Sequence, residues 1–447
     1  MRGKSFPEEV FRMSLRLLFR HGLALLAVAF LAGCGPRPSG KFGGAVRIQV
    51  DLGALGREFQ PRLRGVMIGS WESQATDGFL AERLREAGVR FLEFPGGLEA
   101  DGYDWQNPGP GRMGPARFAA LAEAAGVPAR MCIVDYRAND PAKAAGWVRE
   151  ARRRGWGITY WEVGDEEYGS WAAGATPAEY AERFRRYHAA MKSADPAARI
   201  GAPIALGDPA WSRETLCRIG DLLDWVALSY YPQDPGGEND TRLLLAPDEL
   251  TRRIEEVRGW LAEAAPGRRI EIFITGWHTV SWDPGPQTLS PVAGLFAAEA
   301  IGAMAEAGVD AAGIFCGRMG LAARGGSYGL FDTGPDPGPG RPAYWGLLAW
   351  AAAEGHLAAV DSSEEAIRAW AVAGADRILV VIVNRDGSRS FSARLELDGY
   401  SPGPSEMVVR RYGGGHSRLE EVGRMAPAAA FELTLPPYSL TVVEGPR

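Results

Sequence analysis

The chain has 447 residues, of which 46% are hydrophobic, and its formal net charge is −6. This length and apolar content suffice for one large folded core and a smaller second one. The weak net charge, with no basic stripe carrying interleaved aromatic residues, excludes the electrostatic footprint of a nucleic-acid-binding protein.

The first 34 residues have the pattern of an export signal rather than of a folded segment. An apolar run over residues 23–31 is too short to span a bilayer and follows several basic residues, as in a signal peptide. It ends in Leu31-Ala32-Gly33-Cys34, which resembles a bacterial lipoprotein lipobox. That resemblance implies an exported, lipid-anchored protein of the bacterial cell envelope, with Cys34 lipidated and residues 35–44 as a tether. An ordinary signal peptide with an incidental cysteine is the alternative.

Apolar strand-like segments alternate with amphipathic helical segments over residues 62–333. The strand candidates are residues 65–71, 89–94, 129–136, 158–164, 198–205, 223–231, 270–277 and 309–316. Thr176 and Ser290, each followed by proline, mark helix starts, and Gly308 marks a helix end. Eight such alternations predict an α/β fold, a (β/α)₈ TIM barrel, whose functional side chains gather at the C-terminal strand ends. A doubly wound open sheet is the alternative, but residues 69–72 lack its glycine-rich fingerprint.

The pattern changes after the barrel segment. Residues 334–355 read as a Pro- and Gly-rich linker followed by one helix. Residues 356–447 alternate in hydrophobicity with period two and predict a β-sandwich. An early strand within residues 45–61 is expected to join that sandwich.

Cysteine and histidine usage argues against a disulfide framework or a metal site. Apart from Cys34, the chain has Cys132, Cys217 and Cys316, an odd number, and its five histidines show no metal-ligand spacing. We therefore expect no cofactor and no metal.

Glu166 is the first candidate catalytic residue. It belongs to residues 160–169 (Tyr-Trp-Glu-Val-Gly-Asp-Glu-Glu-Tyr-Gly), an apolar strand that ends in three consecutive acids. A carboxyl group at the C-terminal end of a barrel strand is well placed for proton transfer. Cleavage of a glycosidic bond, however, normally requires two facing carboxyl groups. The strand that should carry the second, residues 271–278, has Gly276 in that place.

Several segments resemble, in order, the family 51 glycoside hydrolases, the α-L-arabinofuranosidases of clan A. The matching segments are residues 94–97 (Phe-Pro-Gly-Gly), 102–105 (Gly-Tyr-Asp-Trp), 132–136 (Cys-Ile-Val-Asp-Tyr), 160–169, 327–331 (Ser-Tyr-Gly-Leu-Phe) and 435–440 (Leu-Pro-Pro-Tyr-Ser-Leu). The resemblance spans residues 45–447. It implies a clan A barrel that acts on carbohydrate.

The resemblance also implies roles for single residues at the strand ends. Glu166 takes the place of the family's acid/base, and Asp165 that of the asparagine that binds the sugar 2-hydroxyl. Gly276 stands where the family has its nucleophilic glutamate. Glu93 replaces the arginine that orients this nucleophile, and Asp135 replaces an asparagine. Because the nucleophile and its arginine are both absent, we do not expect the usual retaining hydrolysis.

Other candidate residues would contact the sugar. Ser229 and Tyr231 lie where the family tends to have a His-Tyr-Tyr sequence on the sixth strand. Trp277, Trp71 and Trp105, together with Tyr231, are candidates for stacking on sugar faces.

Three functions remain open: a carbohydrate-binding protein without hydrolysis, a glycosidase that uses Glu166 with Glu93 or Asp135, and an envelope interaction scaffold. The expected partners are an oligo- or polysaccharide and, through Cys34, a membrane.

Overall fold

Eight parallel strands close into a barrel, as the alternating sequence pattern predicts. They are β2 (Gly65–Met67), β3 (Phe91–Phe94), β4 (Ala129–Val134), β5 (Tyr160–Val163), β6 (Arg199–Pro203), β7 (Trp225–Tyr230), β8 (Glu271–Trp277) and β9 (Ala311–Phe315). The structure is a computed structural model that describes residues 45–73, 78–334, 336–401 and 405–447. Cys34 and the predicted signal peptide and tether lie outside these residues. Each strand falls within its predicted segment, so the predicted (β/α)₈ fold is confirmed.

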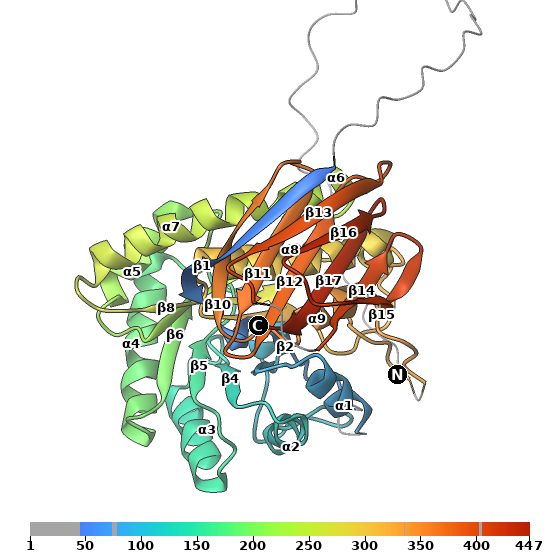
Figure 1. Ribbon diagram of the computed structural model, residues 1–447. Coiled ribbons are helices and arrows are strands. Elements are labelled where there is room, and N and C mark those ends of the chain that lie inside the picture. The colour runs from blue at the N-terminus through green and yellow to red at the C-terminus, as the bar shows by residue number, and fades with distance from the viewer. Residues whose placement is uncertain (1–44, 74–77, 335, 402–404) are drawn as a thin grey trace, which may run out of the picture. The chain divides into compact units, whose positions relative to one another are not determined.

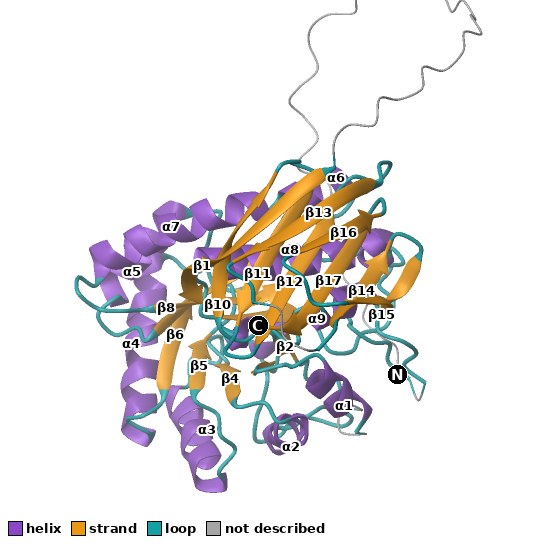
Figure 2. Cartoon of the chain, viewed as in Figure 1, coloured by secondary structure: helices purple, strands orange, loops and turns teal. Residues whose placement is uncertain are grey.

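Helices surround the barrel strands (Figure 2). The helices are α1 (Phe79–Glu86), α2 (Pro115–Ala125), α3 (Pro141–Arg154), α4 (Pro177–Ala194), α5 (Pro209–Ile219), α6 (Asp240–Leu245), α7 (Pro247–Ala264), α8 (Pro291–Ala307) and α9 (Pro342–Leu348). Helix α4 begins at the predicted capping box of Thr176 and Glu179. Ser290 does not cap α8, because its hydroxyl donates instead to the Gln287 carbonyl at 2.8 Å. Gly308 ends α8 in the left-handed conformation, with a φ of 68°.

The interior of the barrel is filled by side chains from alternate positions of its strands. Phe91 on β3 packs there with Tyr160, Trp225 and Phe273. Since side chains alternate along a strand, Glu93 points into the barrel too, one layer nearer the C-terminal mouth. Polar groups therefore follow the hydrophobic layer toward the end of the barrel where function is expected.

A second sheet of nine strands follows the barrel in sequence and also takes up the N-terminal strand. Its strands are β1 (Val46–Glu58), β10 (His356–Ser362), β11 (Ile367–Ala373), β12 (Arg377–Asn384), β13 (Phe391–Asp398), β14 (Met407–Gly413), β15 (His416–Met425), β16 (Ala430–Leu435) and β17 (Ser439–Pro446). Figure 1 shows β1, in blue, among the orange and red C-terminal strands. It pairs antiparallel with β10 and parallel with β13. The region predicted as a β-sandwich thus forms one continuous mixed sheet of nine strands. This sheet has its own cluster of buried hydrophobic side chains.

A buried ion-pair network connects the barrel helices to this sheet. The Arg385 guanidinium, which follows β12, donates to both carboxylate oxygens of Glu299 on α8 and to Asp248 on α7, at distances of 2.8–3.0 Å. Burial raises the pKa of Glu299 to about 7, although the Arg385 charge and hydrogen bonds act in the opposite direction. The sheet is therefore joined to the barrel at helices α7 and α8.

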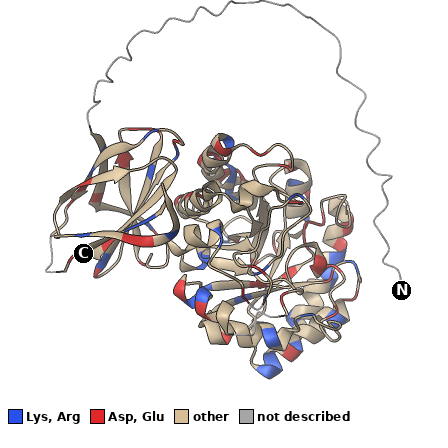
Figure 3. Cartoon of the chain, turned by 90° about the vertical axis from the view of Figure 1, so that its right-hand side faces the viewer, with Lys and Arg blue, Asp and Glu red and all other residues tan. Residues whose placement is uncertain are grey.

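Along the helices of the barrel, residues of both charges are interspersed, as the blue and red segments of Figure 3 show. Among the described residues, no helix is both long and apolar enough to cross a membrane.

Candidate functional site

A cavity of about 960 Å³ opens at the C-terminal mouth of the barrel. The loops after β2, β3, β5, β6, β7, β8 and β9 contribute to its lining. The lining side chains that carry rings or carboxyl groups are Trp71, Glu99, Asp165, Glu166, Tyr168, Trp171, Asp208, Tyr231, Asp234, Trp282, Phe315 and Tyr328. This is the end of the barrel where the fold collects functional groups.

Glu166 enters the cavity from a turn directly after β5. Its φ of 54° is a left-handed conformation, which is uncommon for glutamate and concentrates at functional sites. One carboxylate oxygen of Glu166 accepts a hydrogen bond from the Trp171 indole Nε1 at 2.7 Å. The next residue, Glu167, is fully buried and turns away from the cavity. Glu166 and Glu167 thus have different environments, and of the two only Glu166 can contact a ligand in the cavity.

Asp165 lies beside Glu166 at the cavity wall and is only 7% exposed. Burial, followed by the charges of Glu166 and Asp101, raises the pKa of Asp165 well above its ordinary value. None of the described residues donates a hydrogen bond to its carboxyl group. A nearly buried carboxyl group of this kind is costly unless a proton or a ligand satisfies it.

More acids are buried below the floor of the cavity. Glu93 on β3 and Glu162 on β5 are fully buried, and none of the described residues hydrogen-bonds to their side chains. Burial raises the pKa of Glu93, with Asp165 adding to the effect, and it raises that of Glu162, with Asp165 and Glu93 adding. Burial without a hydrogen-bond partner therefore favours the protonated, neutral form of both groups.

Asp101 and Glu167 form a further carboxyl pair beside this region. Burial raises the pKa of Glu167, and its hydrogen bond to Asp101 and the charge of Asp101 raise it further, to about 10. Because two close carboxyl groups cannot both ionise, Glu167 is the one that keeps its proton.

Gly276 faces the cavity. It stands where the resemblance to family 51 leads us to expect a nucleophilic glutamate. Strand β8 has an irregularity between Thr275 and Trp277 in its pairing with β9, and Gly276 has a φ of 73°. A Cβ atom added at Gly276 would lie 3.2 Å from the Tyr231 hydroxyl and 3.4 Å from Met67 Cε. Both residues line the cavity. A side chain at this position would therefore point toward the cavity, and its Cβ would crowd the Tyr231 hydroxyl.

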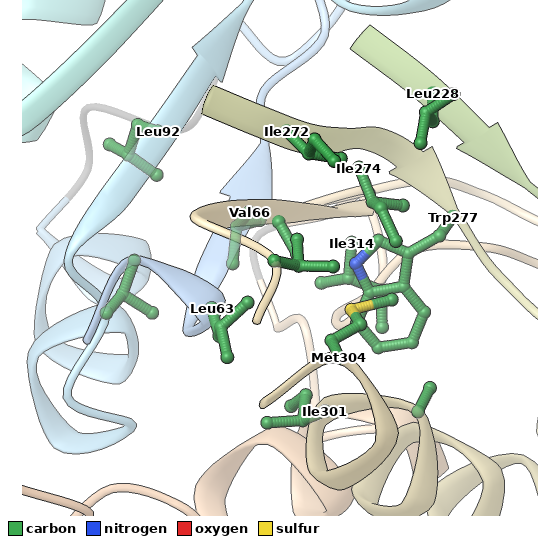
Figure 4. Close-up of a cluster of buried hydrophobic side chains, with 14 of the residues drawn as sticks. Leu63, Val66, Leu92, Leu228, Ile272, Ile274, Trp277, Ile301, Met304 and Ile314 are labelled. Atoms are coloured by element: carbon green, nitrogen blue, oxygen red, sulfur yellow. The ribbon is translucent and has the colours of Figure 1, made fainter. Parts of the chain in front are cut away.

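Trp277 does not line the cavity, which corrects the prediction that it stacks on a sugar. It is fully buried and packs edge-on against Phe296 of α8, with 6.2 Å between ring centroids. Figure 4 shows it among Met304 and Ile314 in the core. The backbone irregularity at Gly276 directs residue 276 toward the cavity and leaves Trp277 facing the helix layer.

Trp105 and Asp135 also lie outside the cavity. Trp105 stacks on Trp147 and donates through its indole nitrogen to the Lys143 carbonyl at 3.1 Å. Asp135 follows β4 and accepts a hydrogen bond from the backbone N–H of Ala138 at 3.0 Å, as a turn residue does. Glu93 lies below the cavity floor and does not line it. Neither proposed second carboxylate therefore faces Glu166 across the cavity.

The structure does bring the other predicted residues to the cavity. Asp165, Glu166, Ser229, Tyr231 and Trp71 all line it. The charges of Glu166 and Asp165 add to burial in raising the pKa of the Tyr231 hydroxyl. These three groups consequently lie within electrostatic reach of one another.

Sequence reasoning missed two aromatic residues at the rim. Trp171 and Trp282 line the cavity with 59% and 68% of their surfaces exposed. Each follows a barrel strand by a few residues, in a loop after β5 or β8. The rule that strand-to-helix loops build the site at this end of the barrel could have identified both.

Three further acids line the cavity, and each already has a partner. Glu99 pairs with Arg112, Asp208 caps α5 through the Trp211 N–H, and Asp234 accepts from the Ser281 hydroxyl.

Within the described part of the chain, no lysine, arginine or histidine lines the cavity. The site therefore disfavours anionic ligands. Nor do the described residues include a group of three or more His, Cys, Asp or Glu placed to hold a metal.

No protein-family model matches this chain, and no curated protein matches it in sequence. The solved structures give clear similarities. The α-L-arabinofuranosidase from Thermotoga maritima, in an arabinose complex, is 18% identical with a TM-score of 0.76, covering 90% of this chain and 100% of that one. A family 51 arabinofuranosidase from Xanthomonas axonopodis pv. citri is 16% identical with a TM-score of 0.74 and the same coverage.

A more distant similarity extends to another family. The family 44 endoglucanase Cel44A from Clostridium thermocellum is 14% identical with a TM-score of 0.66, covering 89% of this chain and 99% of that one. The chain thus has the fold of the clan A glycoside hydrolases, with the barrel and attached sheet domain of the family 51 arabinofuranosidases.

Proposed function

We propose that this protein binds carbohydrate in the cavity at the barrel mouth and does not cleave it by the two-carboxylate retaining route. The observation that carries the proposal is Gly276, which opens to the cavity where the fold's second carboxylate is expected. Retaining hydrolysis needs a nucleophilic carboxylate about 5–5.5 Å from the acid/base. In a serine hydrolase, loss of the nucleophile costs about 10⁶ in turnover.

The composition of the cavity suits a sugar. Exposed rings of Trp171 and Trp282 can stack on the apolar faces of a pyranose or furanose. The carboxyl groups of Asp165 and Glu166 can accept hydrogen bonds from sugar hydroxyls. The cavity volume of about 960 Å³ admits more than one sugar ring. These features support binding without requiring hydrolysis.

The alternative of a glycosidase that pairs Glu166 with Glu93 or Asp135 has less support. Inverting enzymes separate their carboxyl groups by about 6.5–9.5 Å with a water between them. Glu93 is buried below the floor and Asp135 is engaged in a turn outside the cavity. A water held between either residue and Glu166 would not lie in the cavity.

The proposal includes attachment to a membrane of the cell envelope through a lipid on Cys34. It rests on the sequence pattern of residues 1–34. In cells supplied with labelled palmitate, the chain is expected to carry label and the Cys34→Ala variant to carry none. Label on the variant would contradict the anchor.

Binding at the cavity is tested with a panel of plant and bacterial oligosaccharides, measured by calorimetry. Wild type and Glu166→Gln are expected to bind the same glycan within a few-fold. Trp282→Ala should weaken that binding at least about tenfold, which is about 1.4 kcal/mol. Trp105→Ala is the matched control and should bind as wild type does. Loss of binding in Trp105→Ala but not Trp282→Ala would place the ligand elsewhere.

Hydrolysis is tested with aryl α-L-arabinofuranosides. We expect no release of the aryl group above background from wild type. A burst of aryl leaving group that disappears in Glu166→Gln, together with a trappable glycosyl-enzyme intermediate, would overturn the second half of the proposal.

Restoring a carboxylate at Gly276 should not create a retaining hydrolase. At a φ of 73° a glutamate is strained, by about 1–3 kcal/mol, and no described lysine or arginine lines the cavity to orient it. The Gly276→Glu variant is therefore expected to melt at a lower temperature and to leave aryl arabinofuranosides intact. Gly276→Ala carries the same backbone strain without the carboxylate and serves as the control. Turnover by Gly276→Glu alone would show that the remaining site is already poised for retaining chemistry.

A further inference from the structure

The region of the cavity beside Gly276 offers one free donor and one free acceptor. The Tyr231 hydroxyl lies 3.2 Å from the point that a Cβ at Gly276 would occupy. Among the described residues it makes no hydrogen bond, and neither does the Asp165 carboxyl group. Both face the same cavity as Glu166. The other lining acids, by contrast, are held by partners within the fold.

A donor and an acceptor presented together match the two ends of an amide group. The Tyr231 O–H can donate to an amide carbonyl, and the Asp165 carboxyl group can accept from the amide N–H. A 2-acetamido group on a sugar places such an amide next to the anomeric carbon. Such a group would lie beside Gly276, where the chain itself places no side chain and where the Tyr231 hydroxyl is close by. The lack of lysine, arginine and histidine among the described lining residues fits a neutral amide better than a sugar carboxylate or phosphate.

We infer that the cavity takes a β-linked 2-acetamido-2-deoxy sugar, whose own acetamido oxygen supplies the nucleophile that the chain lacks. This inference rests on the proposed carbohydrate-binding function and adds the substrate class and the reaction. Substrate-assisted hydrolysis of this kind needs one acid/base residue and no nucleophile from the protein. Glu166 is the residue in the cavity for the first role.

In the first step, the acetamido carbonyl oxygen forms a bond to C1 while the bond from C1 to the leaving oxygen breaks. The leaving oxygen keeps the bonding electron pair and takes the proton of the Glu166 carboxyl group. Tyr231 donates to the carbonyl oxygen and orients it. An oxygen of the Asp165 carboxyl group accepts a hydrogen bond from the N–H of the resulting bicyclic oxazolinium ion, which stabilises that ion.

In the second step, a water oxygen attacks C1 and the Glu166 carboxylate takes the proton of that water. The bond between C1 and the acetamido oxygen breaks and the acetamide is regenerated. One glycosidic bond is cleaved and one water is consumed. The configuration at C1 is retained, because it is inverted twice.

The test uses the full chain and 4-nitrophenyl 2-acetamido-2-deoxy-β-glycosides of the gluco and galacto configurations. Turnover is expected with at least one of them. It should fall steeply when the acetyl group is replaced by mono-, di- and trifluoroacetyl groups, because fluorine withdraws electrons from the attacking oxygen. The cyclic thiazoline analogue of the intermediate should bind more tightly than the free sugar.

Two variants test the assigned residues, and one controls for the loss of a carboxylate. Asp165→Asn and Tyr231→Phe should each lower kcat/KM for the acetamido substrate about 10²–10³-fold. Their melting temperatures should stay near that of wild type. Asp135→Asn, which lies outside the cavity and can keep its turn hydrogen bond, should leave kcat/KM unchanged.

The outcomes separate this inference from the proposed function. A rate that does not respond to fluorination, or an absence of both turnover and thiazoline binding, overturns the acetamido mechanism. If other glycans still bind in a Trp282-dependent manner, the proposed carbohydrate-binding function survives that result. If the best ligand is the free 2-amino sugar and it is not turned over, the acetamido mechanism is likewise overturned. If no glycan binds at all, both fail.

Discussion

Replacing Trp277 with alanine should lower the free energy of unfolding by about 3–5 kcal/mol, the usual cost of removing a large buried aromatic side chain. Trp277 is fully buried between β8 and α8, so its loss leaves a cavity in the core. The protein that remains folded should still bind carbohydrate, because Trp277 does not line the cavity. Urea unfolding and calorimetric titration measure the two effects separately.

Trp282→Ala is expected to have the opposite pair of effects, with stability kept and glycan binding weakened. Its ring is 68% exposed at the cavity rim, and its removal should change the unfolding free energy little while weakening glycan binding. A Trp277→Ala protein of normal stability that has lost binding would contradict the placement of Trp277 in the core. It would return that residue to the sugar-stacking role that the sequence suggested.

Stability should fall as the pH rises from 6.5 to about 8.5. The pKa values of Glu93, Glu162 and Asp165 are raised by burial, so the folded state holds protons that the unfolded state releases. Stabilisation by such groups is complete below their ordinary pKa values of 4.5, 4.5 and 3.8 and is lost as the pH rises through the folded-state values. Each extra proton held by the folded state contributes a slope of about 1.4 kcal/mol per pH unit.

The chosen pH window separates this effect from that of a buried histidine. Burial lowers the pKa of His278 to about 3 from its ordinary value of 6.5. Below pH 6.5 this histidine therefore makes stability rise as the pH rises, which is the opposite of the effect of the buried acids. The Glu93→Gln variant should be more stable than wild type at the upper end of the window and show a flatter pH dependence. The exposed Glu123→Gln substitution should leave the slope unchanged. A wild-type stability that rises across this window would contradict the protonated state of the buried acids.

The sequence predicts the barrel well because its signal is repeated eight times. Each strand is a short apolar run between amphipathic helices, and the closed barrel follows from their number. The ends of the strands also indicate correctly which loops form the cavity, which is why Asp165, Glu166 and Tyr231 come together there. Hydrophobic patterning is sufficient for this level of structure.

The direction of single side chains at the strand ends could not be predicted as well. Consecutive residues on a regular strand face opposite sides, so Gly276 and Trp277 cannot both face the cavity, and the irregularity in β8 decides between them. Glu93 points into the barrel as its position requires, but depth along the barrel axis places it below the floor. Likewise, the parallel pairing of β1 with β13, which makes the second sheet continuous, depends on contacts that are distant in sequence.

Native mass spectrometry of the whole protein with its best-binding aryl glycoside tests most directly whether the cavity binds sugar without a protein nucleophile. The expected spectrum shows a one-to-one complex under native conditions and the unmodified protein mass after denaturation. A sugar mass that persists after denaturation and maps to a residue lining the cavity would contradict the account, because it would reveal a nucleophile in the protein.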